Sequence, residues 1–270
     1  EVDASVVVGF GGYVSVPAYL AARKRRIPIV VHEANARPGL ANRLGARWAV
    51  TVASAVPKVL AGAQPIGIPL RIGISQLDRG QARASARSSL GLGDGPVLLV
   101  TGGSQGARRL NAAVTAAAPA LAAAGVQVLH VTGARQEAQV RDDLGAAGPA
   151  THHVLGYIDD MAIAYAASDL VLCRAGAMTC AELAAIGLPA VYVPLPIGNG
   201  EQALNARPTV DAGGGLLVDD AALDVAYVTG SVLSLLLDPD RLSTMGKAAA
   251  CLGRPNADDE LAALILAAAR

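Results

Sequence analysis

The stretch Leu98-Leu99-Val100-Thr101-Gly102-Gly103-Ser104-Gln105-Gly106-Ala107 decides the fold class of this chain. It begins with an aliphatic run that is typical of a strand buried on both faces. A glycine-rich turn follows, and the segment behind the turn has the alanine- and leucine-rich pattern of a helix. Residues 6–15 and 171–179 repeat the order of strand, glycine turn and helix. This repetition predicts an α/β fold in which right-handed crossovers join parallel strands.

The same alternation extends along most of the chain. We expect strands at residues 5–8, 29–32, 96–101, 126–131, 169–173 and 190–194. We expect helices at about residues 17–26, 39–45, 107–124, 135–144, 179–186, 201–212 and 226–237. The segment 62–95 is polar and contains several glycines, and it interrupts the pattern. It is predicted to connect two domains and to end in a short lead-in helix.

Two domains follow from this division. The first covers residues 1–70 and the second covers residues 71–254, while a last helix at 255–270 could pack back on the first domain. The first domain is short for a doubly wound fold. The chain also opens at Glu1, directly before an apolar strand. We therefore expect a further N-terminal segment to precede Glu1.

Composition and charge exclude several classes of protein. Of the 270 residues, 53% are hydrophobic and 16% are charged, which excludes a disordered chain. Lysine and arginine total 22, as do aspartate and glutamate, so no overall basic charge indicates a nucleic acid partner. Three cysteines without metal-ligand spacing argue against a zinc site or a disulfide framework and favour a reducing compartment. No apolar run approaches the ~20 residues that a membrane-spanning helix needs.

The glycine-rich turns are candidate phosphate sites. A helix start offers free N–H groups and a partial positive charge, and glycines let the backbone approach an anion closely. Ser104 is the best candidate because its hydroxyl and its N–H can both donate to a phosphate; its alternative role is to cap the following helix. For each turn, a tight connection without a ligand is the alternative. A dehydrogenase is disfavoured, because the chain has no GxGxxG motif with a downstream acidic residue.

Polar residues of two later helices are candidate sugar ligands. Glu182 follows Thr179 by three residues, so it either closes a capping box or accepts hydrogen bonds from vicinal ribose hydroxyls. Gln202 and Asn205 lie about one helical turn apart and share a face. Their amides both donate and accept, as sugar hydroxyls require. A solvated polar turn explains this pair equally well.

Seven motifs along the chain carry a family resemblance. They are residues 9–17 (GFGGYVSVP), 32–35 (HEAN), 39–42 (GLAN), 67–71 (GIPLR), 102–108 (GGSQGAR), 156–161 (GYIDDM) and 174–183 (RAGAMTCAEL). Together they resemble the MurG family. The resemblance implies a GT-B fold, with two Rossmann-like parallel-sheet domains facing a cleft. It also implies an inverting transferase of peptidoglycan synthesis, which moves N-acetylglucosamine from UDP-N-acetylglucosamine (UDP-GlcNAc) to the 4-hydroxyl of the lipid I muramyl sugar and gives lipid II.

The resemblance implies roles for individual residues as well. The donor would lie mainly on the second domain, with its ribose on Glu182. Asn205 shares a helix face with Gln202, and we include it among the candidates. The other implied donor-binding residues are Arg71 and Ser104 at the phosphates, Tyr157 and Ile158 at the uracil, Ala177, Met178 and Thr179 beside the diphosphate and sugar, and Gln202 and Asn35 at the sugar hydroxyls.

One family motif is absent, namely a glycine-rich loop of the type Gly-Gly-Thr-Gly-Gly-His. We expect this loop, with the main catalytic base, in the segment that precedes Glu1. His32 and Glu33, at a predicted strand end, are the visible candidates for the base, and the alternative for His32 is a structural role. We expect no metal or other cofactor, because helix-start N–H groups and Arg71 would stabilise the leaving diphosphate. The run Asp238-Pro239-Asp240 is interpreted as a helix stop.

The basic run Arg23, Lys24, Arg25 and Arg26 either ends a solvated helix or contacts anionic lipid. Because the implied acceptor carries an undecaprenyl chain, we expect peripheral attachment to the cytoplasmic face of the plasma membrane. Three alternatives stay open for the whole protein. They are a GT-B transferase with another acceptor, a UDP-GlcNAc 2-epimerase-like enzyme, and a non-catalytic nucleotide-sugar-binding subunit.

Overall fold

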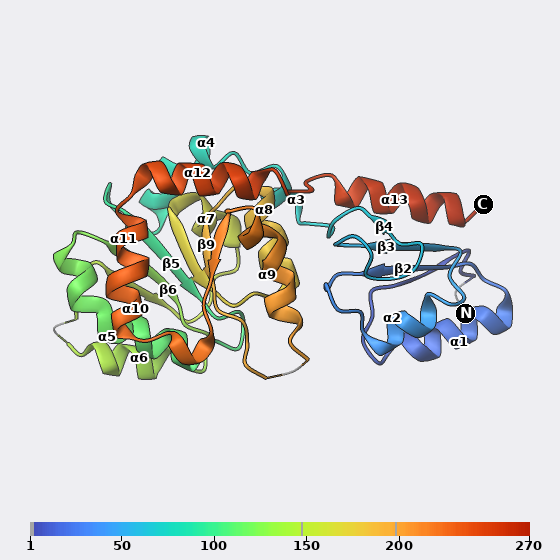
Figure 1. Ribbon diagram of the computed structural model, residues 1–270, viewed down its shortest axis with the longest axis horizontal. Helices are drawn as coiled ribbons and strands as arrows, with labels where there is room; N and C mark the ends of the chain where they lie inside the picture. Colours follow the sequence, from blue (N-terminus) through green and yellow to red (C-terminus); the bar gives the residue numbers. More distant parts are fainter. Residues whose placement is uncertain (1–2, 147, 198) are drawn as a thin grey trace. The chain divides into compact units, whose positions relative to one another are not determined.

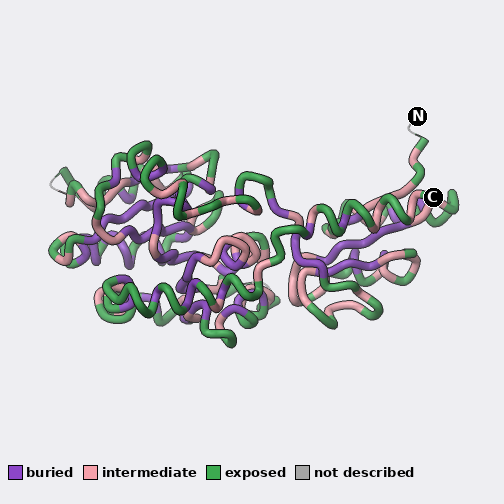
Figure 2. Tube along the Cα trace, turned by 90° about the horizontal axis from the view of Figure 1, so that it is seen from above, coloured by how far each residue is buried: buried purple, intermediate pink, exposed green. Residues whose placement is uncertain are grey.

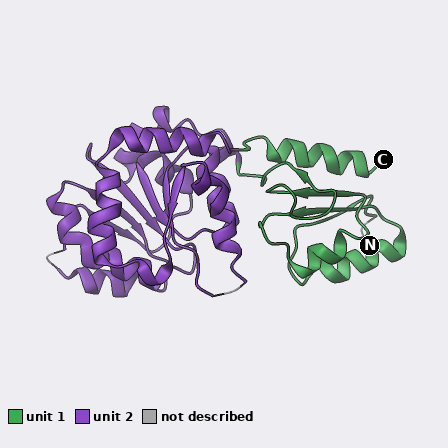
Figure 3. Ribbon diagram, in the orientation of Figure 1, with its two compact units in different colours: residues 1–71, 254–270 green, residues 72–253 purple. Residues whose placement is uncertain are grey.

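The computed structural model describes residues 3–146, 148–197 and 199–270. The chain divides into two compact units (Figure 3). Unit 1 consists of residues 1–71 and 254–270, and unit 2 consists of residues 72–253. Unit 1 is therefore assembled from two separate segments of the chain, whereas unit 2 is continuous in sequence.

Unit 1 is a four-stranded parallel sheet with helices on both faces. Its elements are β1 (Val7–Gly9), α1 (Ser15–Arg25), β2 (Ile29–Glu33), α2 (Leu40–Gly45), β3 (Thr51–Ser54), β4 (Gln64–Pro65) and α13 (Ala257–Ala268), and the strand order is β1-β2-β3-β4. Successive side chains of β2 point to opposite faces. Ile29 and Val31 pack with Tyr19 of α1, whereas Val30 packs with Leu261 of α13. Helices α1 and α2 thus cover one face and α13 covers the other (Figure 1).

Unit 2 is built on a six-stranded parallel sheet. The strands are β5 (Val97–Thr101), β6 (Gln127–Val131), β7 (His152–Leu155), β8 (Leu170–Cys173), β9 (Ala190–Tyr192) and β10 (Gly215–Leu217). Their order across the sheet is β10-β9-β8-β5-β6-β7. The central strands are buried at every residue, as the aliphatic run of β5 predicts (Figure 2).

Helices cover both faces of this sheet (Figure 1). They are α3 (Ile72–Ser75), α4 (Arg79–Ser89), α5 (Arg108–Ala123), α6 (Glu137–Leu144), α7 (Met161–Ala167), α8 (Ala177–Ala185), α9 (Glu201–Asp211), α10 (Val225–Tyr227), α11 (Leu233–Leu236) and α12 (Pro239–Ala250). A π-helical turn, Val228–Val232, joins α10 to α11. Helix α5 packs with α6 and with this turn, α4 packs with α7, and α8 packs with α9 and α12.

The predicted parallel α/β class and all six predicted strands are confirmed. The prediction missed β3, β4, β7 and β10, because these strands are short and their residues do not form aliphatic runs. It also missed α7 and α12. The helix stop predicted at residues 238–240 is confirmed, because α11 ends at Leu236, but the same residues also begin α12, which the prediction did not include. The Asp238 carboxylate accepts the Arg241 N–H at 2.9 Å, and Pro239 occupies the first turn, where a proline is tolerated.

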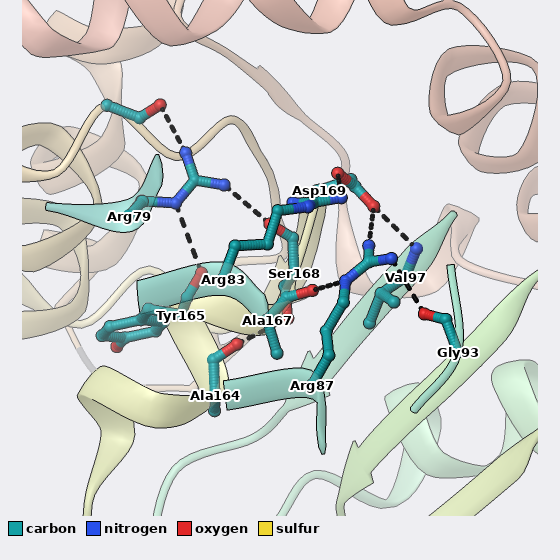
Figure 4. A network of polar contacts seen from close by, with 11 residues as sticks. Arg79, Arg83, Arg87, Gly93, Val97, Ala164, Tyr165, Ala167, Ser168 and Asp169 are labelled. Carbon is teal, nitrogen blue, oxygen red and sulfur yellow. Dashed lines mark hydrogen bonds and ion pairs between the residues drawn. The ribbon is translucent and has the colours of Figure 1, made fainter. Parts of the chain in front are cut away.

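An ionic network closes the amino end of the unit 2 sheet (Figure 4). Arg79, Arg83 and Arg87 recur every four residues along α4 and therefore share one face. Asp169, directly before β8, accepts from Arg83 at 2.5 Å and from Arg87 at 2.9 Å. The same carboxylate accepts the Val97 N–H at 2.8 Å, so it also holds the start of β5. We call these five residues the amino-end network.

Arg79 makes a different set of contacts within this network. Its guanidinium donates to the backbone carbonyls of Tyr165 at 3.3 Å, Ser168 at 2.6 Å and Gly187 at 3.3 Å (Figure 4). Burial, assisted by the neighbouring Arg83 cation, lowers the pKa of Arg79 to about 10. The side chain is still charged at neutral pH, and its donors satisfy carbonyls at the end of α7 and beyond α8.

Candidate functional site

The carboxyl ends of β5 and β8 form the topological switch point of unit 2. From β5 the chain continues to β6 and β7 on one side of the sheet, and it then returns to β8 and continues to β9 and β10 on the other. Thr101, the last residue of β5, pairs with Cys173, the last residue of β8. The loops that follow these two strands therefore leave the sheet side by side. Open α/β sheets bind ligands at such a point.

The loop 102–106 after β5 has backbone donors without acceptors. The Gly106 N–H donates to the Gly103 carbonyl at 2.9 Å, which closes a tight turn. Within the described part of the chain, nothing accepts from the N–H groups of Ser104 or Gln105, and both residues are exposed. The alternative role of Ser104 as a helix cap is wrong, because the N-cap of α5 is Ala107. The loop can therefore direct two N–H groups and a hydroxyl to an anion.

Helix α8 begins at the same end of the sheet. Gly176 is its N-cap, and the first helical hydrogen bond runs from the Cys180 N–H to the Gly176 carbonyl at 2.9 Å. The predicted capping box is wrong, because Thr179 lies inside the helix. Three N–H groups precede this first bond and have no acceptor among the described residues; they belong to Ala177, Met178 and Thr179.

A buried tyrosine holds Glu182. The hydroxyl of Tyr165, in α7, donates to Glu182 Oε2 at 2.7 Å. Tyr165 is 1% exposed, and burial together with the Glu182 carboxylate raises the pKa of its phenol, which therefore remains a donor. Tyr165 is not among the residues predicted from the sequence, because 17 residues and a complete strand separate it from its partner. Its only signal is a hydroxyl-bearing side chain in an otherwise apolar helix.

Arg174, the first residue after β8, connects three elements around the switch point. Its guanidinium lies 2.6 Å from Asp220 and donates at 3.2 Å to the carbonyls of Val193 and Pro194, after β9. Asp220 also forms an ion pair with Arg109 of α5, at 3.0 Å. These contacts fix the loop that leads from β9 to α9.

The two predicted amides of α9 lie beside this loop. Gln202 Oε1 accepts the Leu195 N–H at 2.9 Å, so this side chain braces the start of the loop. Asn205 is 8% exposed and donates to the Ala175 carbonyl at 3.4 Å. The interpretation of Asn205 as part of a solvated turn is therefore wrong, because its amide is buried against the loop after β8.

Tyr157 and Ile158 follow β7, at the edge of the same sheet. The Tyr157 side chain is 59% exposed and that of Ile158 is half-buried. The predicted residues of unit 2 thus all lie in loops after strand ends or within α8 and α9. The predicted residues Asn35, Arg71, His32 and Glu33 belong to unit 1.

His32 ends up inside unit 1 and is 1% exposed. Its Nε2 lies 2.7 Å from the Gly67 carbonyl oxygen. A carbonyl only accepts, so Nε2 carries the proton and Nδ1 carries the lone pair. Burial lowers the pKa of His32, and the ring is therefore neutral. This geometry gives His32 a role in holding the segment after β4.

Glu33 organises the turn that carries Asn35. Its carboxylate accepts the N–H groups of Asn35 and Gly39 at 3.0 and 3.1 Å and the amide of Asn42 at 3.0 Å. With several donors on one buried carboxylate, Glu33 fixes the path from β2 to α2. A catalytic role for His32 or Glu33 stays a prediction.

The basic run lies at the end of α1. Arg23, Lys24, Arg25 and Arg26 are all exposed. The guanidinium carbon of Arg23 lies 4.6 Å from the centre of the Trp48 ring, which is a cation–π geometry. The cations also suit the carbonyl end of the helix.

Known families account for most of the sequence. Residues 97–261 match the glycosyltransferase family 28 C-terminal domain, and residues 1–54 match the glycosyltransferase family 28 N-terminal domain. Both matches lie in the order that two-domain glycosyltransferases of this family have along the chain.

Individual relatives narrow this assignment. The UDP-N-acetylglucosamine--N-acetylmuramyl-(pentapeptide) pyrophosphoryl-undecaprenol N-acetylglucosamine transferase of Streptomyces avermitilis is 56% identical over 264 residues, which are 97% of this chain and 72% of the relative. The protein of the same name from a Nocardioides species is 58% identical over 268 residues, 98% of this chain and 73% of the relative. The crystal structure of Acinetobacter baumannii MurG matches with a TM-score of 0.78 and 33% identity, over 97% of this chain and 73% of that one. This chain belongs to the MurG family. The predicted GT-B class and the predicted enzyme class, an N-acetylglucosaminyltransferase, are confirmed.

MurG-family membership also decides between two enzyme classes that share this architecture. The UDP-GlcNAc 2-epimerase from Neisseria meningitidis, in a structure bound to UDP-GlcNAc, matches with a TM-score of 0.66 but only 15% identity, over 97% of this chain and 76% of that one. Such a match shows a common fold and nothing more. The relatives above 50% identity carry a transferase name, so the epimerase alternative has no support.

Two further features are absent from the described residues of this MurG-family chain. No helix among them is long and apolar enough to cross a bilayer. No three histidine, cysteine, aspartate or glutamate side chains within those residues gather as a metal site requires.

Proposed function

We propose that this chain transfers N-acetylglucosamine from UDP-GlcNAc to the 4-hydroxyl of the muramyl sugar of lipid I, which gives lipid II. The observation that carries the proposal is the switch point of unit 2. There, the loop 102–106 and the start of α8 follow two paired strands. They bring backbone N–H groups that have no acceptor among the described residues to the carboxyl end of the sheet. Such groups suit the diphosphate of a nucleotide sugar. The names of the MurG-family relatives support the acceptor.

The ribose, the uracil and the sugar of the donor have candidate ligands around the same end of the sheet. Glu182, oriented by the Tyr165 hydroxyl, accepts hydrogen bonds from the ribose hydroxyls. Asn35 and Arg71 are also proposed donor ligands. The remaining proposed contacts are Ser104 to the phosphates, Tyr157 and Ile158 to the uracil, Ala177, Met178 and Thr179 to the diphosphate and sugar, and Gln202 and Asn205 to the sugar hydroxyls.

The proposed reaction inverts the anomeric centre. The acceptor 4-hydroxyl oxygen attacks the anomeric carbon, the bond between that carbon and the diphosphate oxygen breaks, and UDP leaves. Negative charge grows on the diphosphate, where N–H groups of the loop and of α8 stabilise it together with Arg71. A general base takes the hydroxyl proton. His32, through Nδ1, and Glu33 remain the candidates for the base within this chain.

The proposed reaction needs no divalent cation, because backbone donors and Arg71 neutralise the leaving group. We expect unchanged turnover after the enzyme and substrates are treated with excess EDTA. Turnover that disappears in EDTA and returns with Mg²⁺ or Mn²⁺ would contradict this part of the proposal.

The proposed attachment to the membrane is peripheral and uses the basic run at the end of α1, on the cytoplasmic face of the plasma membrane. Each exposed cation near an anionic surface contributes about 1 kcal/mol. We expect the protein to sediment with vesicles that contain anionic lipid at low salt. A variant with Arg23, Lys24, Arg25 and Arg26 changed to glutamine should stay in the supernatant. A control with Arg241→Gln and Lys247→Gln, exposed in α12 of unit 2, should still sediment.

The donor site is tested by titration with UDP, UDP-GlcNAc and UDP-glucose. Glu182→Ala should weaken all three alike, about 30-fold, because the ribose is common to them. Gln202→Ala should weaken UDP-GlcNAc and leave UDP unchanged. Glu260→Ala, an exposed glutamate of α13, is the matched control and should change nothing. UDP affinity that is insensitive to Glu182→Ala would overturn the proposed site.

The acceptor is tested by product analysis. With lipid I and UDP-GlcNAc we expect lipid II and UDP in equal amounts. Transfer to a diacylglycerol or an aglycone in preference to lipid I would instead favour a GT-B transferase with another acceptor.

A further inference from the structure

A continuous chain of side-chain hydrogen bonds runs beneath the loop 102–106. His152 Nε2 lies 3.0 Å from His130 Nδ1, and His130 Nε2 lies 3.0 Å from Asn111 Oδ1. Asn111 Nδ2 lies 3.0 Å from Gln136 Oε1, and Gln136 Nε2 lies 3.2 Å from the Gln105 carbonyl oxygen. This series of hydrogen bonds thus starts in β7, passes through β6 and α5, and ends on the loop. We call these four side chains the imidazole–amide chain.

Backbone carbonyls fix the direction of every hydrogen bond in this chain. Asn111 Nδ2 also lies 3.0 Å from the Thr132 carbonyl, so this atom must be the amide nitrogen. Gln136 is fixed in the same way by the Gln105 carbonyl. Asn111 Oδ1 is then an acceptor, and His130 must donate from Nε2 and accept at Nδ1. His152 consequently donates from Nε2, and all four donors point toward the loop.

The electrostatic state of the two imidazoles agrees with this direction. His130 is fully buried, and burial together with the His152 ring lowers its pKa to about 3. Burial, with a contribution from His153, lowers the pKa of His152 to about 4. Both rings are therefore neutral at physiological pH, and the chain carries no charge that would attract or repel a phosphate by itself.

The imidazole–amide chain ends where the loop packs closely on the segment after β6. Gly106 packs so closely on the next loop that a Cβ atom there would overlap the Thr132 carbonyl oxygen and meet Gln136 Nε2 at 2.6 Å. Gln136 thus holds the Gln105 carbonyl on the underside of the loop. The exposed residues Ser104 and Gln105, whose N–H groups have no acceptor among the described residues, belong to the same short turn. Aligned hydrogen bonds also polarise one another, so each donor strengthens the next.

We propose that the imidazole–amide chain positions the loop 102–106 for the donor diphosphate, with Gln136 as the residue that transmits this constraint to the loop. The inference rests on the proposed function, because it takes the diphosphate to lie on this loop. None of the four side chains touches substrate in this arrangement, so each is a positioning residue. Their loss should therefore affect phosphate-bearing ligands and spare the nucleoside.

The test compares the affinities of UDP and uridine in two variants of Gln136. In Gln136→Glu an oxygen replaces the nitrogen that donates to the Gln105 carbonyl, and we expect UDP to bind about tenfold more weakly while uridine changes less than twofold. Gln136→Met removes the donor without adding charge, and the expected loss for UDP is about threefold. The KM for UDP-GlcNAc should rise in proportion, with kcat changed less than KM.

Two controls separate the possible outcomes. Gln139→Glu makes the same substitution on the same helix at an exposed position and should leave both affinities unchanged. Ser104→Ala reports on the proposed site itself and should weaken UDP. Equal loss of UDP and uridine in the Gln136 variants, or no loss of UDP while Ser104→Ala weakens it, would overturn this inference alone. If UDP binds normally to Ser104→Ala and to both Gln136 variants, the diphosphate is not on this loop, and the proposed site fails as well.

Discussion

Polar side chains line both ends of the unit 2 sheet, and the two ends use them in opposite ways. The amino-end network is ionic, and its arginines meet either Asp169 or backbone carbonyls (Figure 4). The imidazole–amide chain is neutral, and it runs from His152, the first residue of β7, to the loop at the other end of the sheet. It finishes below a loop whose Ser104 and Gln105 N–H groups have no acceptor in the described part of the chain.

Polar groups that are satisfied within the protein and polar groups that are left without a partner contribute to different properties, namely stability and ligand binding. Donors and acceptors that are satisfied within the chain stabilise the folded state, whereas exposed N–H groups contribute little to folding and are available to a ligand. Substitutions at the amino end should therefore change the free energy of unfolding. Substitutions in the loop 102–106, or in the side chains beneath it, should in addition change the affinity for UDP.

Acidification should have the largest effect, because it lowers the free energy of unfolding through the histidines of the imidazole–amide chain and does not titrate the arginines of the amino-end network. In the unfolded chain histidine titrates near pH 6.5, whereas folded His130 and His152 have pKa values of about 3 and about 4. Between these limits the unfolded state binds more protons, so stability falls as the pH falls below 6.5. At about 1.4 kcal/mol per pH unit and histidine, the two together lose about 5 kcal/mol by pH 4.5. Arg79, whose pKa is about 10, stays charged throughout.

Denaturant titrations at pH 7.0 and 4.5 measure this loss. His152→Gln keeps an amide donor in reach of His130 but removes one titrating ring, and the loss of stability between the two pH values should shrink by about 2.5 kcal/mol, the share of one histidine. An unchanged loss in His152→Gln would show that other groups govern the acid sensitivity.

The amino end should respond most to Asp169→Ala. This change leaves the Arg87 guanidinium, whose side chain is 8% exposed, and the Val97 N–H without their carboxylate. We expect a loss of about 3 kcal/mol in the free energy of unfolding. UDP affinity, measured where the variant is folded, should stay within twofold of wild type. Asp143→Ala, an exposed carboxylate of α6, is the control. A large loss of UDP affinity in Asp169→Ala would remove the distinction between the two ends.

Two glycines of the loop 102–106 offer a matched pair for the carboxyl end. Gly103 and Gly106 have φ values of 78° and 72°, a region that L side chains rarely adopt. A Cβ atom at Gly103 would meet open space, whereas one at Gly106 would overlap the Thr132 carbonyl. Gly103→Ala should lower the free energy of unfolding by about 1 kcal/mol because of backbone strain. Gly106→Ala should lower it by about 2 kcal/mol or more. UDP titration should show the larger loss for Gly106→Ala; equal losses would mean that packing beneath the loop is unimportant.

The smallest expected effect belongs to Tyr165→Phe. The variant removes the hydroxyl that donates to Glu182 and keeps the buried ring. We expect UDP to bind about threefold more weakly, because the carboxylate loses one orienting donor. In a Glu182→Ala background the same change should have no effect on UDP. An equal effect in both backgrounds would show that Tyr165 acts on the fold and not through Glu182.

The sequence predicts best what depends on neighbours along the chain. Aliphatic runs and glycine turns gave β5, β8 and the loops behind them, because burial on both faces and positive φ leave a local pattern. The short strands β3, β4, β7 and β10 were not predicted, because their residues do not form aliphatic runs. The helix that starts at Pro239 was not predicted, because a proline that follows one helix can also open the next, as it does in α12.

The residues of the candidate site differ in the same way in how far the sequence predicts them. Ser104 and the start of α8 were accessible to prediction because they follow strands directly. Tyr165, His130 and Gln136 were not, because each works through a partner that the sheet brings from another element. Parallel pairing between distant segments creates these juxtapositions, and no spacing in a single sequence encodes them.

Helix α13 gives unit 1 an unusual dependence on the order of synthesis. It covers Val30 and Ala53 of the sheet, yet its residues are translated only after the whole of unit 2. During synthesis, α13 is therefore not yet available to cover these residues while unit 2 is being translated. Within residues 3–270, unit 1 therefore receives its last helix only after unit 2 has been translated.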